Sequence, residues 1–321
     1  MKAVIYTEYG PPEVLKFQEV PKPVPTDNEV LIKIHATTVN RTDTGFRSAE
    51  YFIIRLFHGL FKPKKQILGT ELSGEIEAVG KDVKSFKVGD QIFGLSTFNF
   101  GTHAEYICMS ENKSIVPKPV NMSFEQAAAV SEGLMMAYNY IRRIDFKVHP
   151  KILINGASGS IGSACVQLAK YFGADITAVC GTKNLELVKA LGANEVIDYT
   201  AEDFTLCGKS FDVVLDMVGK STFFKCKKIL KPGGIYYSSE LGPWSQNIFL
   251  SLLSPFYFGR KVKFPIPTDS KEDMLFFKKL IEEGHYKAVI DRSYSLAQIV
   301  EATKYVETGE KTGNVVIQMA Q

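Results

Sequence analysis

The sequence has few cysteines, no long apolar run and almost no net charge, and each absence excludes a class of protein. Its five cysteines are scattered without a C-x-x-C pair, which excludes a zinc ribbon and a disulfide framework. A formal net charge of +3 in 321 residues is too small to argue for nucleic acid as a partner. We find no apolar run long enough to span a bilayer and no signal-peptide pattern. We therefore expect a cytoplasmic protein without a membrane span.

Metal ligands are also sparse. The segment 90–110 offers only His103 and Cys108, whereas a structural zinc site needs four closely spaced ligands. The five histidines show no paired spacing, so a catalytic zinc set is not predicted either. We expect each histidine to be an ordinary surface or half-buried residue, and we expect no metal.

The most informative stretch is 151–170, KILINGASGSIGSACVQLAK. Apolar residues of a strand lead into Gly156, Gly159 and Gly162, and apolar residues then recur at helical spacing. In a dinucleotide-binding turn the first glycine allows the bend, the second lets a pyrophosphate approach and the third lets helix and strand pack closely. The helix N-terminus would favour the phosphates. We predict dinucleotide binding; the alternative is a tight turn without a ligand.

The end of the second strand of this unit indicates which dinucleotide binds. An NAD-binding unit normally has Asp or Glu there, whereas this chain reads Cys-Gly-Thr-Lys-Asn at 180–184. Thr182 and Lys183 offer a hydroxyl and an ammonium to a 2′-phosphate, which favours NADPH. Lys183 as a merely exposed residue is the alternative. Tyr199, after the third strand, is expected either to cover the adenine edge or to close the sheet.

The order of elements predicts two kinds of domain. Short strand signals separated by turns fill residues 1 to about 125 and favour a β barrel or sandwich. A capping box, Ser123 with Gln126, then starts a helix. From Lys151 strands and helices alternate, as in a parallel sheet with helices on both faces. Two helices and a strand follow Pro265, and their periodicity does not say which domain the strand joins.

Two aromatic-rich stretches, 51–61 and 247–258, fall outside this strand and helix pattern. One interpretation is that they cover the cores of the domains. The other is that both line a lipophilic substrate cleft.

Several segments together carry a family resemblance: 1–15 (MKAVIYTEYGPPEVL), 39–51 (VNRTDTGFRSAEY), the turn NGASGSIG, LGANEVIDYTAEDF and the closing EKTGNVVI. In this order and spacing they resemble a zinc-independent medium-chain dehydrogenase/reductase of the quinone oxidoreductase-like type. The resemblance implies an α/β protein, with a GroES-like β domain and a Rossmann domain that has a doubly wound parallel sheet. Expected bounds are 1–123 for the GroES-like catalytic domain, 124–267 for the Rossmann domain, and 268–321 for a segment that returns to the catalytic domain.

The resemblance also implies roles for single residues. Asn40 and Tyr51 would lie near the nicotinamide, and Asp43 would be a framework residue of the same stretch. Where zinc-dependent relatives have Gly-His-Glu, this chain has Thr70 in place of the histidine. The segment 133–137 departs from the related Gly-Leu-Thr-Ala, so a hydroxyl near the nicotinamide is missing. The implied NADPH contacts are Asn40, Gly156, Ser158, Gly159, Ser160, Ile161, Gly162, Thr182, Lys183, Tyr199, Val218, Ser239, Lys311 and Asn314.

These features predict an oxidoreductase that transfers hydride from NADPH to quinones or α,β-unsaturated carbonyl compounds, without a metal. The charge that develops on such substrates is delocalised, so a hydrogen bond from Tyr51, with water as proton source, would suffice. Tyr51 is alternatively a wall of the pocket, and Asn40 is alternatively a cap for its own loop.

Two other functions remain open. An enoyl-thioester reductase would need a basic entrance, for which Arg47, Arg55 and the run KPKK at 62–65 are candidates. The second is an NADPH-binding redox sensor with little activity. The expected partners are a small lipophilic substrate and a second copy paired through the edge segment 261–265, KVKFP.

Overall fold

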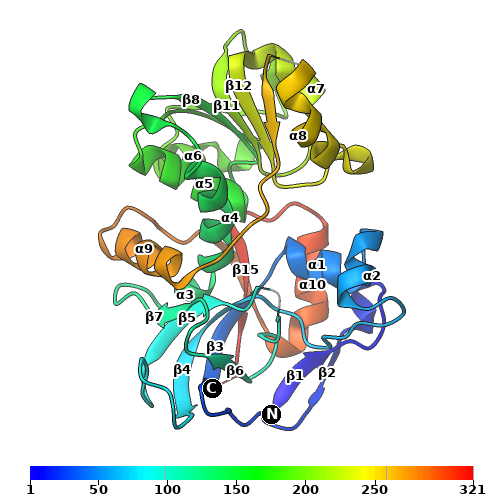
Figure 1. Ribbon diagram of the computed structural model, residues 1–321, viewed down its shortest axis with the longest axis vertical. Helices are drawn as coiled ribbons and strands as arrows, with labels where there is room; N and C mark the ends of the chain where they lie inside the picture. The colour runs from blue at the N-terminus through cyan, green and yellow to red at the C-terminus, as the bar shows by residue number, and fades with distance from the viewer. Residues whose placement is uncertain (98, 258, 321) are drawn as a thin grey trace. The chain divides into compact units, whose positions relative to one another are not determined.

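The chain divides into two units, each built on its own β-sheet (Figure 1). Unit 1 contains Met1–Glu132 and Asp269–Gln321, and unit 2 contains Gly133–Thr268. This computed structural model describes residues 1–97, 99–257 and 259–320. The boundaries expected from the sequence, after residues 123 and 267, stay a prediction.

Unit 1 has a seven-stranded sheet of mostly antiparallel strands and a separate two-stranded ribbon. The strand order is β14-β15-β3-β4-β5-β7, and β6 pairs with β3. The C-terminal strand β15 pairs antiparallel with β3, so this strand belongs to the sheet of unit 1. The strands are β1 (Lys2–Ile5), β2 (Lys16–Glu19), β3 (Glu29–Val39), β4 (Glu71–Val79), β5 (Gln91–Leu95), β6 (Tyr106–Ser110), β7 (Ile115–Pro117), β14 (Ile290–Ser295) and β15 (Asn314–Gln318).

The α-helices of unit 1 are short, and local capping explains where several of them begin. The predicted capping box at Ser123 is present: its hydroxyl accepts from the Gln126 N–H, and the Gln126 side chain accepts from the Ser123 N–H. Two exchanged hydrogen bonds of this kind satisfy backbone donors that a helix leaves unpaired. These helices are α1 (Arg41–Ser48), α2 (Phe52–His58), α3 (Phe124–Ala128), α9 (Lys271–Glu282) and α10 (Ile299–Glu307).

Unit 2 has the parallel sheet that the alternating pattern predicted. Its six strands follow the order β10-β9-β8-β11-β12-β13, and all neighbours are parallel. This is the doubly wound order of dinucleotide-binding domains. The strands are β8 (Lys151–Asn155), β9 (Asp175–Cys180), β10 (Glu195–Asp198), β11 (Phe211–Asp216), β12 (Leu230–Ser238) and β13 (Lys261–Lys263). The helices are α4 (Ser131–Ile141, which starts at the end of unit 1), α5 (Ser160–Tyr171), α6 (Leu185–Leu191), α7 (Phe223–Cys226) and α8 (Gln246–Tyr257).

The two aromatic-rich stretches form helices, which the sequence analysis missed. The first contains α2 and the second contains most of α8. On α2 only Ile54 and His58 are buried, while large apolar side chains point to solvent. A helix with apolar residues on both its inner and outer faces has no polar stripe, so the period of 3.6 is hidden. The inner face of α2 therefore covers a core through Ile54 and His58, whereas its outer face does not.

The glycine turn between β8 and α5 shows why the third glycine is needed. Gly162 lies in the first turn of α5, and a Cβ there would collide with the backbone carbonyl oxygen of Gly156. The helix therefore packs against the turn that follows β8 more closely than any side chain would allow.

We predict that Gly162→Ala lowers the free energy of unfolding by about 1–3 kcal/mol, the usual cost of forcing an extra carbon into a packed site. The better helix propensity of alanine does not compensate for a clash with backbone. Denaturant unfolding of the full chain measures the effect. Gly159→Ala is the matched control, because a Cβ there meets only the Gly156 oxygen at 3.5 Å. Equal stability of Gly162→Ala and wild type would contradict the packing argument.

Candidate functional site

The turn of unit 2 leaves backbone donors ready for an anion. Gly156 has φ of +79°, and a Cβ on it would lie 2.7 Å from the Val218 side chain. Gly159 is the N-cap of α5 and offers no side chain to the first turn. The N–H groups of that turn, beginning at Ser160, therefore suit the pyrophosphate of a dinucleotide. The chain's own geometry fits the predicted cofactor here.

The other predicted cofactor residues of unit 2 lie at the carboxyl ends of neighbouring strands. Val218 follows β11 and sits against Gly156. Ser239 follows β12, and its N–H donates to the Asp216 carbonyl oxygen at the end of β11. This edge of a parallel sheet is where ligands of doubly wound domains bind. The structure thus gathers Val218 and Ser239 at the edge that carries the glycine turn.

One premise of the NADPH prediction needs correction. The sequence offered no carboxylate at the end of β9, but the structure supplies one from the neighbouring strand. Asp198 ends β10 opposite Cys180, and the Thr182 hydroxyl donates to its Oδ2 at 2.5 Å. Tyr199 is exposed, and its hydroxyl lies so near Gly181 that a Cβ on that glycine would be 3.2 Å from it. A 2′-phosphate near Thr182 would therefore meet a negative charge, and exposed Lys183 becomes the residue that must offset it.

In unit 1, Asn40 begins α1 through a complete capping box. Its side-chain oxygen accepts from the Asp43 N–H at 3.1 Å, and the Asp43 carboxylate accepts from the Asn40 N–H at 3.0 Å. The other oxygen of Asp43 accepts from the Gly69 N–H at 2.9 Å. Burial raises the pKa of Asp43 to about 7. Asp43 thus connects the start of α1 to the segment before β4, the framework position that the resemblance implied.

The remaining polar atoms of Asn40 are also occupied. Its Nδ2 donates to Thr70 Oγ1 at 3.0 Å and to Glu132 Oε2 at 2.5 Å. A side-chain amide has two N–H donors, and both are used here. The capping alternative for Asn40 is therefore what the structure shows.

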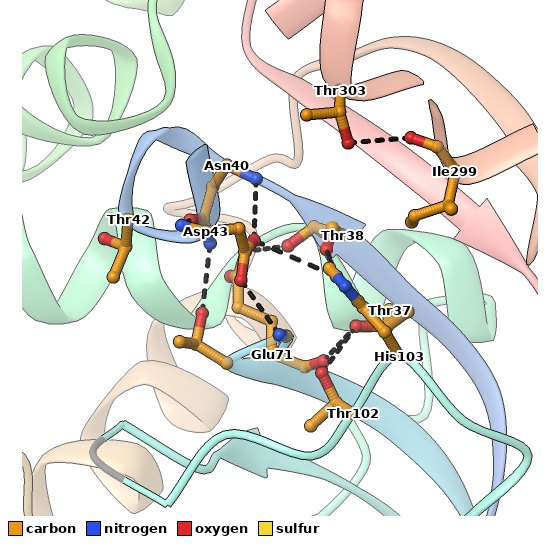
Figure 2. A network of polar contacts seen from close by, with 12 residues as sticks. Thr37, Thr38, Asn40, Thr42, Asp43, Glu71, Thr102, His103, Ile299 and Thr303 are labelled. Atoms are coloured by element: carbon orange, nitrogen blue, oxygen red, sulfur yellow. Dashed lines mark hydrogen bonds and ion pairs between the residues drawn. The ribbon is translucent and has the colours of Figure 1, made fainter. Parts of the chain in front are cut away.

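Glu71 lies in the network that Figure 2 shows, together with Thr38, Asn40 and Asp43. Its carboxylate also accepts from the Glu132 N–H, and we call Glu71 and Glu132 the carboxyl pair. Glu71 is fully buried, and its two oxygens meet the Glu132 N–H at 2.7 Å and the Thr38 hydroxyl at 2.5 Å. Glu132 accepts from the Thr42 and Thr70 hydroxyls in addition to Asn40. Burial is the largest cause that raises the pKa of each carboxyl, and the charge of Glu132 adds to the shift of Glu71.

The residues expected from the C-terminal segment lie in the same unit. Lys311 is half-buried, and its Nζ donates to the Gly313 carbonyl at 2.5 Å. Burial lowers its pKa, while the charges of Glu71 and Glu132 oppose that shift, so its ammonium lies within electrostatic reach of the carboxyl pair. Asn314 is buried and donates to the Val289 carbonyl. Tyr51 is the half-buried N-cap residue of α2.

Among the described residues, no group of three or more His, Cys, Asp or Glu is placed to hold a metal ion. The expectation that every histidine is surface or half-buried is wrong for two of them. His58 and His103 are buried; the Nε2 of His58 lies 2.7 Å from the Tyr6 hydroxyl, and that of His103 lies 2.8 Å from the Thr38 carbonyl.

Of the residues expected to form a basic entrance for a thioester substrate, Arg47 is buried and does not contribute. Arg47 is 2% exposed, donates to the Gly10 carbonyl and forms an ion pair with Glu307. It links α1 to α10 inside unit 1 and is not available to a ligand. Arg55 stacks on the Tyr9 ring, with its guanidinium carbon 4.6 Å from the ring centre.

Sequence reasoning missed Glu132 altogether. It follows the apolar run 127–130 and precedes Gly133, so a charge among residues expected to be buried was the available signal. Its partners Thr42 and Thr70 are distant in the sequence and carry no motif of their own.

The comparisons with known proteins agree with this geometry. Residues 26–120 match the family model described as alcohol dehydrogenase GroES-like domain, and 191–317 match zinc-binding dehydrogenase. The 2-methylene-furan-3-one reductase of Solanum lycopersicum is 35% identical over 99% of this chain and 79% of its own. The chloroplastic quinone-oxidoreductase QR1 of Triphysaria versicolor is 33% identical over 99% and 98%.

Solved structures give the same result. The quinone oxidoreductase from Coxiella burnetii superposes with a TM-score of 0.87, at 29% identity over 100% of this chain and 99% of that one. The Escherichia coli quinone oxidoreductase complexed with NADPH has a TM-score of 0.83, at 25% identity over 99% and 100%.

The carboxyl pair makes stability depend on pH. Glu71 holds its proton more tightly in the folded than in the unfolded chain, because its pKa is raised above the ordinary 4.5. The free energy of unfolding should therefore fall as pH rises above 4.5, by at most about 1.4 kcal/mol per pH unit. We predict that Glu71→Gln makes this fall less steep. Urea unfolding between pH 4.5 and about 8 measures the effect. Glu8→Gln, at an exposed position, is the control, and equal slopes for wild type and Glu71→Gln would contradict the prediction.

Proposed function

Since the chain belongs to the quinone oxidoreductase-like medium-chain dehydrogenases/reductases, we propose that it is a metal-free reductase of quinones or α,β-unsaturated carbonyl compounds that uses NADPH. The observation that carries the proposal is the glycine turn of unit 2, whose geometry requires glycine at Gly156 and Gly162 and leaves the first turn of α5 uncapped. Relatives named as quinone and alkenal/one oxidoreductases support the substrate class.

We propose cofactor contacts in each unit. In unit 2 the backbone from Ser158 to Gly162 would bind the pyrophosphate, and Lys183 would bind the 2′-phosphate. In unit 1 we propose Lys311 and Asn314 as further contacts. When bound, reduced nicotinamide supplies a hydride.

Metal-free chemistry is supported by the donors that unit 1 presents. Thr70 stands where a zinc-binding relative would have histidine, and its hydroxyl donates to Glu132. Glu71 is hydrogen-bonded at both oxygens, and zinc binding would break those contacts. Without a Lewis acid, deprotonating a simple alcohol is difficult, whereas quinones and enones accept a hydride and delocalise the resulting charge.

We propose two roles for residues of unit 1. Because the amide of Asn40 is fully hydrogen-bonded, Asn40 is a positioning residue that fixes the start of α1 and the place of Glu132. Tyr51 remains our candidate for the hydrogen bond to the substrate oxygen, with water as proton source.

The cellular setting is also a proposal. All five cysteines are free thiols, which suits a reducing compartment such as the cytoplasm. The strand β13 is an edge of its sheet, so it is open to pairing with a second copy of the chain. We expect a small lipophilic substrate and no nucleic acid.

The test is steady-state oxidation of NADPH, followed by absorbance, with quinones, alkenals and crotonyl thioesters. We predict turnover of quinones or alkenals that a zinc chelator leaves unchanged. We also predict that Tyr51→Phe lowers kcat about 100-fold, as expected when a hydrogen-bond donor to the developing oxyanion is lost, while the Kd of NADPH stays unchanged.

Three outcomes would contradict the proposal. Preferential turnover of crotonyl thioesters would favour an enoyl-thioester reductase. Tight NADPH binding without turnover of any compound would favour a redox sensor. Stoichiometric zinc in active enzyme would exclude the metal-free mechanism.

The preference for NADPH depends on the charges beside Thr182. We predict that Lys183→Gln weakens NADPH binding roughly tenfold or more, the effect of losing a hydrogen bond between charged groups. Asp198→Asn should strengthen NADPH binding, because it removes a negative charge close to the 2′-phosphate. Calorimetry with NADPH and NADH measures both effects, and NADH affinity is the internal control. Equal changes for the two nucleotides would show that Lys183 does not contact the 2′-phosphate.

A further inference from the structure

One face of unit 1 exposes apolar side chains that the proposed function does not use. Within α2 and the residues that follow it, six large side chains are between 46% and 87% exposed. Single exposed apolar residues are common, but a contiguous group marks a binding surface. We call this group the apolar patch; it consists of Phe52, Ile53, Leu56, Phe57, Leu60 and Phe61.

The patch is anchored from beneath by buried residues and hydrogen bonds. Ile54 and His58 lie four residues apart on the inner face of α2, and both are buried. The Nε2 of His58 lies 2.7 Å from the Tyr6 hydroxyl, and the Tyr9 hydroxyl donates to the Gly59 carbonyl at 2.7 Å. The helix therefore has an anchored inner face, and the outward direction of the apolar residues is fixed by packing.

The patch adjoins a group of positive charges. Residues 51–70 contain Arg55, Lys62, Lys64 and Lys65 but no Asp or Glu. The three lysines are exposed. In the part of the chain that the structure describes, none of them forms an ion pair. An occupant of this surface must offer apolar volume beside negative charge.

A membrane surface offers that combination. A second copy of the chain would bring the same lysines face to face, which opposes self-association through the patch. An anionic bilayer presents acidic headgroups above an apolar interior, and aromatic and aliphatic side chains flanked by lysines are the usual means of binding at that interface. Among the described residues, no helix has the length and apolar character to cross a bilayer, so contact would be confined to the surface.

We propose that the apolar patch and Lys62, Lys64 and Lys65 bind unit 1 reversibly to the surface of an anionic lipid bilayer. The apolar side chains enter the headgroup region, and the lysines remain at the level of the lipid phosphates.

The test is flotation of the full-length protein with vesicles of phosphatidylglycerol and phosphatidylcholine, compared with vesicles of phosphatidylcholine alone. We expect binding to the anionic vesicles only, weakening as salt is raised. The triple variant Lys62→Gln, Lys64→Gln, Lys65→Gln should bind roughly 100-fold more weakly, from about fivefold per lysine. Phe57→Ser with Phe61→Ser should weaken binding by at least about tenfold, because two apolar side chains no longer leave water.

Matched variants in unit 2 serve as controls. Lys225→Gln, Lys227→Gln, Lys228→Gln changes net charge equally, and Val148→Ser with Leu206→Ser replaces two exposed apolar residues. Both controls should bind as the wild type does. Thermal unfolding confirms that all variants fold, and NADPH binding, measured separately, distinguishes this proposal from the proposed function.

Several results would overturn the proposal. One is no binding of the wild type to anionic vesicles, and another is an equal loss in the control lysine variant. Loss of wild-type dimers in Phe57→Ser, Phe61→Ser, with vesicle binding unchanged, would make the patch an interface between copies. Loss of quinone turnover with unchanged vesicle binding would assign the patch to the substrate site.

Discussion

The polar part of unit 1 depends on one constraint: the Glu71 carboxyl is fully buried, and the half-buried Glu132 belongs to the same hydrogen-bond network. An isolated buried carboxylate is costly, and two neighbouring ones repel each other as well. Around Glu71 and Glu132 the chain supplies the Thr38, Thr42 and Thr70 hydroxyls and the Asn40 amide. These donors come from β3, from α1 and from the residue before β4, so satisfying the pair requires all three segments to be in place.

The same requirement explains the arrangement of α1. Its N-cap Asn40 has one side-chain atom to begin the helix and another to donate to Glu132. Asp43 completes the capping box and reaches Gly69 as well. A capping residue is usually a local device, but here it also connects distant parts of the chain. The stability of α1 and the geometry of the carboxyl pair are consequently coupled.

The sequence predicts features that depend on residues near one another in the chain. It does not predict features that depend on distant residues. The glycine turn at 156–162 and the strands of unit 2 depend on neighbours along the chain, and their patterns predicted the parallel sheet. Asp198 beside Thr182 depends on the pairing of β9 with β10, which periodicity does not specify. Glu132 has partners many residues away, so its place could not be derived from local spacing.

Burial overturned one interpretation that rested on residue type alone and qualified another. Arg47 carries a charge and was a candidate for a surface entrance, yet it is buried beside Glu307. The aromatic-rich segment 51–61 covers a core only through Ile54 and His58, while six of its large side chains face solvent. Residue type gives the average preference, and the exceptions arise where a specific partner outweighs it.

Unit 1 contains two placements of side chains that are each costly for folding. Stability alone would place a charge such as Glu71 in water and Phe57 and Phe61 in a core. Unit 1 does the reverse at both places, and it holds each with specific contacts: hydrogen bonds around the carboxyls, and the His58 anchor beneath the apolar patch. Features that are costly for folding and yet held by specific contacts are expected where a function requires them. The buried Glu71 carboxyl and the exposed apolar patch are therefore the parts of unit 1 whose chemistry folding alone does not explain.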